Sequence, residues 1–287
     1  IGENDPNKNP FFQSSFNFFN KIFGDTPHLQ NQSIHKNGKF IFPIDACLGV
    51  DGFPQSGTGQ TSIYCGVNAS TEIGRHFGPY AHSALKPIIK EKNIFQEFLN
   101  RGLKVSFVNA FPKVFFDYIN SGKTRLNVTS VMAMDSEIKF NDVDDLSDGN
   151  ALSAEITNWR WVEKLDYKIP IIDPEIAADR LLKIASKNDF TLFEYFHTDH
   201  IGHGRLASDK DQLLIDLDCF LYHILNNISD DITLLICSDH GNIEDISIKG
   251  HTINPALGIS AGKYAGHLMQ NIKYLYDIKS AIIELYQ

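Results

Sequence analysis

The sequence lacks a surplus of positive charge. Its 26 Lys and Arg residues are outnumbered by 35 Asp and Glu residues, which gives a formal net charge of −9. A protein that binds nucleic acid as its main partner neutralises the phosphate backbone with basic side chains, so this balance argues against that class. An acidic protein that binds an anion needs local positive charge, and bound metal ions can supply it.

Cysteine is scarce, and no Cys-x-x-Cys pair occurs. The four cysteines all lie among apolar residues: Cys47, Cys65, Cys219 and Cys237. We interpret them as buried thiols, which suits a reducing compartment and therefore a cytoplasmic location.

Long apolar runs, internal repeats and low-complexity tracts are also missing. No run is long enough to span a bilayer, so we expect no membrane partner. No signal peptide is visible. Because the sequence begins with Ile1 and not with Met, we expect the natural N-terminus to lie upstream, and a targeting segment stays open.

What the sequence does contain, from about residue 171 onward, is a regular alternation of strands and helices. Asp173 before Pro174 predicts a helix start, with a capping carboxylate followed by proline at the first helical position, and this helix is expected to run to about Ser186. The other predicted elements are strands at 39–44, 103–110, 190–196 and 232–237 and helices at 93–101, from 208 and at 278–286.

Continuously apolar strands between helices are typical of a parallel sheet that is covered on both faces. We therefore predict an α/β fold with a mostly parallel central sheet and helices on both faces. Residues 1–287 are expected to form one domain. Residues 111–170 are less regular and are interpreted as a small cap or insertion, in which the acidic run 142–145 is expected to be a solvated loop rather than a metal site.

Metal-type ligands gather after the last two predicted parallel strands. Asp199 and His203 follow the strand at 190–196, and Asp239 and His240 follow the strand at 232–237, with His251 shortly after. Ligand sites in α/β folds lie beyond the carboxyl ends of the strands, so these side chains are expected to meet. Mixed carboxylate and imidazole ligands without thiolate suit Zn or Mn better than Mg or Ca. The spacings would hold two divalent metal ions.

Each of these residues has a plainer interpretation when it is taken alone. Asp199 and His203 face the same point only if their segment turns helically, and otherwise they are polar residues in a loop. On spacing alone, His197 or His200 could replace His203. The combination of five ligands in three clusters is what favours a metal site.

A hydroxyl-rich turn at 51–62 is the third segment whose side chains are suited to catalysis. Gly52-Phe53-Pro54 predicts a turn, and the residues after it are expected to open a helix. A hydroxyl at a helix N-terminus, next to a cation, can lose its proton and attack phosphorus. The plainer alternative is an ordinary Ser/Thr/Gly-rich loop. The candidate hydroxyls are those of Ser56, Thr58 and Thr61.

Taken in order, the hydroxyl turn, Asp-x-x-x-His and Asp-His-Gly-Asn…His resemble the alkaline phosphatase superfamily. Within it, the chain is similar to the metalloenzyme group that includes cofactor-independent phosphoglycerate mutase and phosphopentomutase. The most specific match is Ser-Asp-His-Gly-Asn at 238–242 with His-Thr-x-Asn-Pro at 251–255. The resemblance spans about 38–66 and 190–257, and the region between them matches less well.

The resemblance implies a single alkaline-phosphatase-like catalytic domain, a three-layer sandwich with two divalent metals. Ser56 would be the nucleophile that is transiently phosphorylated. The implied metal ligands are Ser56, Asp239 and His240 for one ion and Asp199, His203 and His251 for the other. Arg75 follows shortly after the nucleophile segment and is a candidate to clamp a phosphate oxygen, with an ordinary surface arginine as the plainer alternative, and Asn68 is the second candidate substrate contact.

The resemblance also implies the function, which is phosphoryl transfer from a small-molecule phosphate ester. The chain would be a phosphomonoester hydrolase or phosphomutase-like enzyme. A phosphodiesterase of the same superfamily and a catalytically silent binding module that keeps the fold are the alternatives. The oligomeric state stays open.

The sequence departs from the superfamily pattern in three places. The superfamily uses an Asp from an Asp-Gly pair after its first strand, and no such pair precedes Asp51-Gly52, so we expect that strand to be missing from the numbered chain. Only about 140 residues separate Ser56 from Asp199, too few for a full mutase cap. Gln60 also stands where several mutase-like relatives have His.

Overall fold

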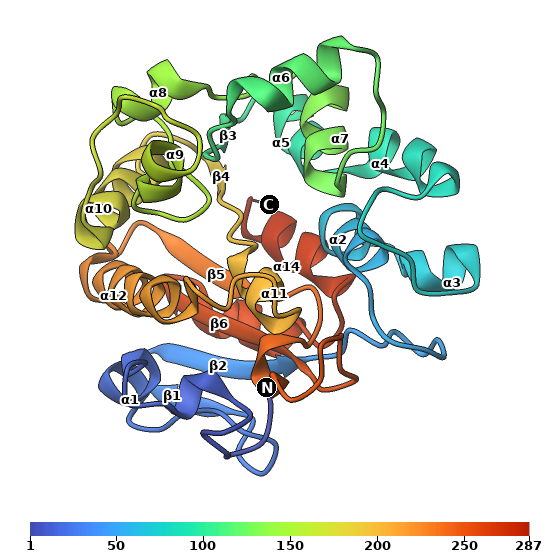
Figure 1. Ribbon diagram of the computed structural model, residues 1–287. Helices are drawn as coiled ribbons and strands as arrows, with labels where there is room; N and C mark the ends of the chain where they lie inside the picture. Colours follow the sequence, from blue (N-terminus) through green and yellow to red (C-terminus); the bar gives the residue numbers. More distant parts are fainter. Residues whose placement is uncertain (287) are drawn as a thin grey trace.

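Two separate β-sheets run through the computed structural model, which describes residues 1–286 (Figure 1). In the larger sheet all neighbours are antiparallel, and its spatial order is β1 (Ile34–Lys36), β2 (Lys39–Ile44), β6 (Ala256–Gly262) and β5 (Thr233–Cys237). The smaller sheet pairs β3 (Val105–Phe107) with β4 (Phe190–Leu192) in parallel.

The predicted mostly parallel central sheet is therefore wrong, although the α/β class holds. The error comes from β6, which the sequence analysis did not anticipate. The chain leaves β5 at Cys237, reverses through the loop 238–255 and returns beside β5 as an antiparallel neighbour, because no crossover helix intervenes. Small residues make β6 hard to detect, and Gly258 is required by packing, since a Cβ there would lie 2.6 Å from the Phe42 ring.

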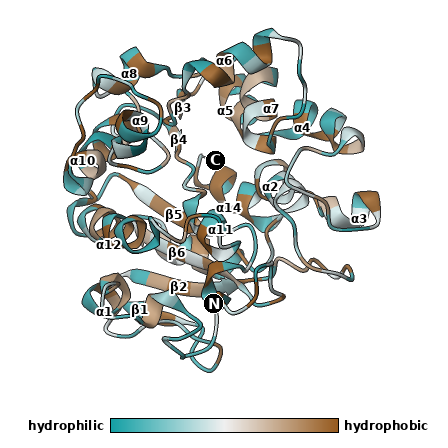
Figure 2. Cartoon of the chain, in the orientation of Figure 1, coloured by the Kyte–Doolittle hydropathy of each residue, from teal (hydrophilic) through white to brown (hydrophobic). Residues whose placement is uncertain are grey.

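Helices cover both faces of the larger sheet. Side chains alternate along β2, so Ile41 points into a core shared with α1, α10 and α12, and Phe42 and Ile44 point into a core shared with α2, α13 and α14. Most of β2 is brown in the hydropathy colouring, as expected for a strand between two cores (Figure 2). The core that contains Phe42 and Ile44 also holds α2 against the end of β5, and the candidate site lies where these two elements meet.

Strands β4 and β5 each form an edge of a sheet; the side chains of β5 pack on both cores, and Phe190 and Leu192 of β4 pack on one. In β5, Leu234 and Ile236 contact one core, and Leu235 and Cys237 contact the other. Every residue of the two strands remains half-buried, because an edge strand has a neighbour on one side only. Both strands end at the segments that carry the predicted ligands.

The region 111–170 consists of short helices joined by loops. The prediction that the acidic run is a solvated loop is wrong, because Asp142 caps a helix and forms a capping box with Asp145.

None of the helices within residues 1–286 is long and apolar enough to cross a membrane. The helices are α1 (Phe18–Phe23), α2 (Ser56–Cys65), α3 (Ala69–Ile73), α4 (Lys86–Lys92), α5 (Ile94–Asn100), α6 (Lys113–Asn120), α7 (Val128–Asp135), α8 (Val143–Ser147), α9 (Trp159–Glu163), α10 (Pro174–Ala185), α11 (His197–Gly202), α12 (Lys210–Asn227), α13 (Ala265–Asn271) and α14 (Asp277–Ile283).

Candidate metal centre

Helix α11 presents the first two predicted ligands. It begins shortly after β4, Asp199 lies in its first turn, and His203 is its C-terminal cap. Residues four apart face the same side of a helix, and His203 Nε2 accordingly lies 3.3 Å from Asp199 Oδ1. The helical turn, and not a loop, is what brings this carboxylate and imidazole together.

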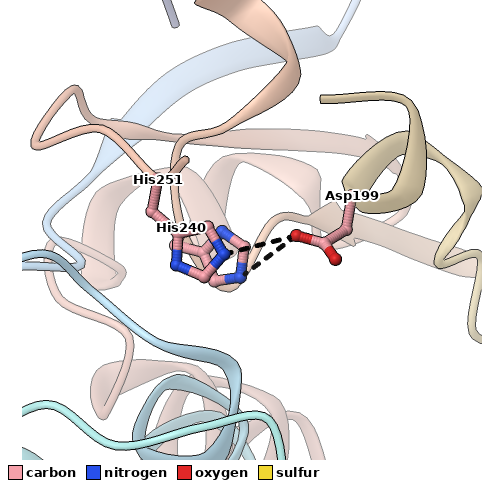
Figure 3. Close-up of side chains that lie close together, drawn as sticks. All are labelled: Asp199, His240 and His251. Atoms are coloured by element: carbon pink, nitrogen blue, oxygen red, sulfur yellow. Dashed lines mark ion pairs between the residues drawn. The ribbon is translucent and has the colours of Figure 1, made fainter. Parts of the chain in front are cut away.

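The loop after β5 brings three further ligands to the same place. His240 Nε2 lies 3.5 Å from Asp239 Oδ1 and 3.9 Å from Asp199 Oδ1. His251 Nε2 lies 3.4 Å from Asp199 Oδ1. The imidazole rings of His240 and His251 stack with their centroids 3.8 Å apart, and both face the Asp199 carboxylate (Figure 3).

The N-terminus of α2 supplies the hydroxyl. Ser56 is the first residue of that helix, and its Oγ lies 2.9 Å from His240 Nε2. One turn further on, the Gln60 amide donates to Asp239 Oδ2 at 3.3 Å. Gly59 permits this approach, because a Cβ at that position would lie 2.7 Å from the carbonyl oxygen of Asp239.

The competing hydroxyls lie elsewhere. The side chains of Thr58 and Thr61 are fully buried, at 0% exposure. Thr58 donates to the Gln55 carbonyl, and Thr61 donates to the Gly57 carbonyl. Of the three candidates, only Ser56 contacts the predicted ligands.

The donor atoms fit a cation. A carbonyl oxygen only accepts hydrogen bonds, so the contacts of His251 Nδ1 with Pro54 O and of His203 Nδ1 with Lys249 O put the proton of each neutral ring on Nδ1. Both Nε2 atoms then offer lone pairs, although they lie 3.2 Å apart. Asp199 Oδ1 is buried and has no hydrogen-bond donor. A divalent ion between these atoms removes the repulsion.

The ligands form one continuous cluster. Ligand atoms of Asp199, His240 and His251 all lie within 4.8 Å of one another. His203 and Asp239 join this group through their contacts with Asp199 and His240. The cluster thus contains every predicted ligand, while the division of these residues between two ions stays a prediction.

Electrostatics in the cluster favour a cation at its centre. Burial opposes a charge on His251, but the neighbouring Asp199 and the Pro54 carbonyl together raise its pKa. Burial also opposes ionisation of Asp199, yet the surrounding imidazoles, His251 first, lower its pKa. Without an ion, a proton on His251 therefore takes the place of the metal charge.

The two alternative histidines lie outside the cluster. His197 packs against the rings of Tyr195, Phe196 and His200. Burial lowers the pKa of His197 to about 3, and burial also lowers the pKa of His200. Neither side chain contacts another predicted ligand among the described residues, so the structure brings His203, and not these two, to the other ligands.

The two predicted substrate contacts, Arg75 and Asn68, have different surroundings. Arg75 is exposed and lines an open cavity of about 360 Å³ beside Ser56, together with Asp51, Gly52, Phe53, Gln55, His76, Phe77 and Gly78. Asn68 caps α3 by accepting from the Thr71 amide, and its own amide group donates to the Leu48 carbonyl. Both polar groups of Asn68 are thus used in holding the backbone.

Glu194 is a half-buried residue near Asp239 that was not predicted from the sequence. It accepts a short hydrogen bond from the Thr129 hydroxyl. Burial raises the pKa of Glu194 to about 7, and the nearby charge of Asp239 also raises it. The available signal was a single acidic residue in the otherwise apolar run 190–196.

Part of the sequence matches a known protein family, and the fold resembles solved structures. Residues 154–286 match the sequence model of the Metalloenzyme superfamily. No curated protein matches the sequence. The structure resembles the alkaline phosphatase of the Antarctic bacterium TAB5, with a TM-score of 0.52 and 15% identity over 85% of this chain and 87% of that chain.

Two further solved structures resemble the chain less. A TAB5 alkaline phosphatase mutant with Mg bound in the M3 site has a TM-score of 0.44 and 15% identity over 85% of this chain and 87% of that chain. The PH0037 protein from Pyrococcus horikoshii has a TM-score of 0.40 and 13% identity over 70% of this chain and 54% of that chain. The family match and the first structure confirm the predicted resemblance at the level of superfamily and fold.

Proposed function

We propose that this chain is an alkaline phosphatase-like metalloenzyme that hydrolyses a phosphomonoester or transfers its phosphoryl group to a second hydroxyl. The match of residues 154–286 to the Metalloenzyme superfamily model and the alkaline phosphatase-like fold support this proposal. The observation that carries this proposal is the position of Ser56. Its hydroxyl oxygen lies at the start of α2 and 2.9 Å from His240 Nε2, at the edge of the ligand cluster. A nucleophile next to a cation site is what phosphoryl transfer through a phosphoserine requires.

Each residue of the proposed site has a separate role. Ser56 Oγ attacks phosphorus as the ester P–O bond breaks and the alcohol leaves, and water or a second hydroxyl then takes the phosphoryl group from the phosphoserine. His240 beside Ser56 would be one of the groups that hold the cation. Asp199, His203, Asp239 and His251 complete the ligand set, and Gln60 keeps the Asp239 carboxylate in place through its 3.3 Å hydrogen bond. When bound, divalent metal ions supply the positive charge that lowers the pKa of the hydroxyl and offsets the charge of the phosphoryl oxygens.

The donor set also suggests the metal. Imidazole and carboxylate ligands without thiolate favour Zn²⁺ or Mn²⁺. Arg75 lines the cavity next to Ser56, and in this proposal its guanidinium binds a phosphate oxygen or an anionic group of the substrate. The open cavity suits a small-molecule ester.

The test is turnover of p-nitrophenyl phosphate together with the metal content of the purified protein. About two bound ions per chain, release of phosphate and a phosphorylated Ser56 in quenched reactions are the expected results. Preference for bis-p-nitrophenyl phosphate would identify a phosphodiesterase instead. A protein that binds no divalent ion and turns over neither ester would contradict the proposal.

A further inference from the structure

Glu244 is a buried carboxylate that lies between two ligand-bearing loops without being one of the clustered ligands. It belongs to a single 3₁₀ turn (Ile243–Asp245) and is 4% exposed. Its Oε2 accepts from the Asn242 backbone N–H at 2.5 Å. Its Oε1 accepts from the Asn254 amide at 3.1 Å and makes a short hydrogen bond with the Thr252 hydroxyl.

These three donors come from both sides of the site. Asn242 lies two residues after His240, and Thr252 is the residue directly after His251. The same two loops also meet through the backbone, where the Thr252 N–H donates to the Gly241 carbonyl at 3.0 Å. Glu244 therefore ties the loop of His240 to the loop of His251.

The space around the carboxylate is closed. A Cβ on Gly241 would lie 2.6 Å from Glu244 Oε1 and would also overlap the Thr252 hydroxyl, so only glycine allows the loops to close on the carboxylate. On the other side, the Asn242 side chain donates to the Gly250 carbonyl at 3.1 Å and packs against Gly202 of α11. The turn around Glu244 is thereby joined to the helix that carries Asp199.

Only a carboxylate matches this surrounding. Three donors converge on its two oxygens, and a carboxylate has acceptors only. A glutamine at this position keeps one oxygen but aims an N–H₂ donor at a neighbour that also donates. A buried donor facing a donor loosens the contact on that side.

We propose that Glu244 is a positioning residue that sets the affinity of the site for its metal ions by fixing His240 and His251 relative to each other. The inference rests on the proposed metal-dependent function of the same cluster. Groups that orient metal ligands from outside the coordination shell commonly change metal affinity about 10–100-fold when they are replaced.

The experiment compares Glu244→Gln with Asp218→Asn. Asp218 is a matched control, since it is 7% exposed and accepts two backbone N–H groups, at 2.6 Å from Asn17 and 2.5 Å from Phe18, far from the ligand loops in sequence and contact. Calorimetric titration of the metal-free proteins with Zn²⁺ measures the affinity, and denaturant unfolding measures the stability. We expect Glu244→Gln to weaken Zn²⁺ binding by about 10-fold or more and Asp218→Asn to leave it unchanged.

A second pair of variants covers the case in which Glu244→Gln does not fold. Thr252→Val removes one of the three donors at nearly constant volume, and Thr252→Ser keeps that donor. We expect weaker Zn²⁺ binding for the valine variant and near-normal binding for the serine variant.

The outcomes separate this inference from the proposed function. Unchanged Zn²⁺ affinity in Glu244→Gln, or an equal loss in Asp218→Asn, overturns the positioning role while the proposed function stands. A wild-type protein that binds Zn²⁺ but hydrolyses no ester contradicts the proposed function, and the affinity ratio still decides the role of Glu244. A wild-type protein that binds no ion overturns both.

Discussion

His203 Nε2 and His251 Nε2 lie 3.2 Å apart, although 48 positions separate them in the sequence. The Nδ1 atom of each ring contacts a backbone carbonyl, so the neutral rings direct two lone pairs at each other. Either a metal ion or a proton must occupy the space between them. The competition between the two makes the site sensitive to pH.

We expect the affinity for Zn²⁺ to fall as the pH is lowered. The pKa of His251 is raised above its usual value, so in the metal-free protein the ring holds its proton at a higher pH than a free imidazole does. Below that pKa the ion must displace the proton, which costs up to about tenfold in affinity per pH unit. Isothermal titration between pH 8 and pH 5 measures the effect. His200→Gln, at a position outside the cluster, should show the wild-type profile, and a flat wild-type profile would refute the competition.

Replacing the proposed nucleophile separates chemistry from metal binding. Ser56→Ala should reduce turnover about 10³-fold or more and abolish the phosphoserine, because the hydroxyls of the other two candidates, Thr58 and Thr61, bond to helix carbonyls and not to the cluster. Metal content should change little, since five other ligands remain. Steady-state kinetics and mass spectrometry of quenched reactions give the two readouts.

Thr58→Val is the matched control for that variant. Its hydroxyl donates to the Gln55 carbonyl within the helix, so its loss should cost about 1 kcal/mol of stability and leave the phosphoserine intact. A phosphorylated Thr58, or full activity in Ser56→Ala, would move the nucleophile away from Ser56.

The substitution Gly202→Ala should disrupt the site through the contact between α11 and Asn242. A Cβ there would overlap the Asn242 side chain, which would force α11 and the loop 238–255 apart. We expect a loss of about 1–3 kcal/mol in the free energy of unfolding, together with weaker metal binding. Gly250→Ala is the control, because a Cβ at Gly250 meets no atom within 4 Å. Equal behaviour of the two variants in denaturant and metal titrations would show that this contact is not limiting.

Arg75 should affect substrate binding more than turnover. Its guanidinium borders the cavity beside Ser56, so Arg75→Ala is expected to raise KM for p-nitrophenyl phosphate about tenfold, the equivalent of one charge-assisted hydrogen bond. Arg101→Ala removes an exposed arginine that pairs with Glu97 within α5 and should leave KM unchanged. A normal KM in Arg75→Ala would place phosphate recognition on other residues.

Local sequence signals predicted individual helices well. The helix predicted to begin at Asp173-Pro174 is α10, and its observed end lies within one residue of the expected one. The helix predicted at 93–101 is α5. These features depend on capping and on 3.6-residue periodicity, which act within a few residues. The pairing of strands depends on partners far away in the chain, and the small residues of β6 hide the partner that makes the sheet antiparallel.

In the candidate site, too, local sequence signals predicted some residues, while residues with distant partners were missed. The spacing after each strand indicated the candidate ligands but left His197 and His200 open beside His203, and the resemblance was needed to single out His203, which the structure brings to Asp199. Glu194 and Glu244 were missed because the partners of each carboxylate come from distant or irregular segments. The same limit applied to Asn68, where a capping role in α3 depends on backbone geometry that a resemblance does not show.

His197 should make the metal-free protein sensitive to acid. Burial lowers its folded-state pKa to about 3, whereas an unfolded chain takes up the proton near the usual value of 6.5. Between these values the unfolded state binds one more proton, so the free energy of unfolding falls as pH decreases, by up to about 1.4 kcal/mol per pH unit.

The variant His197→Phe tests this effect. It keeps an apolar ring against Tyr195 and Phe196 and cannot titrate, so its unfolding free energy should fall less steeply between pH 6 and pH 4. Urea unfolding in the presence of a chelator measures both slopes, with His35→Gln, at an exposed histidine, expected to match the wild type. If the His197→Phe slope equals that of the wild type, the acid sensitivity arises from other groups.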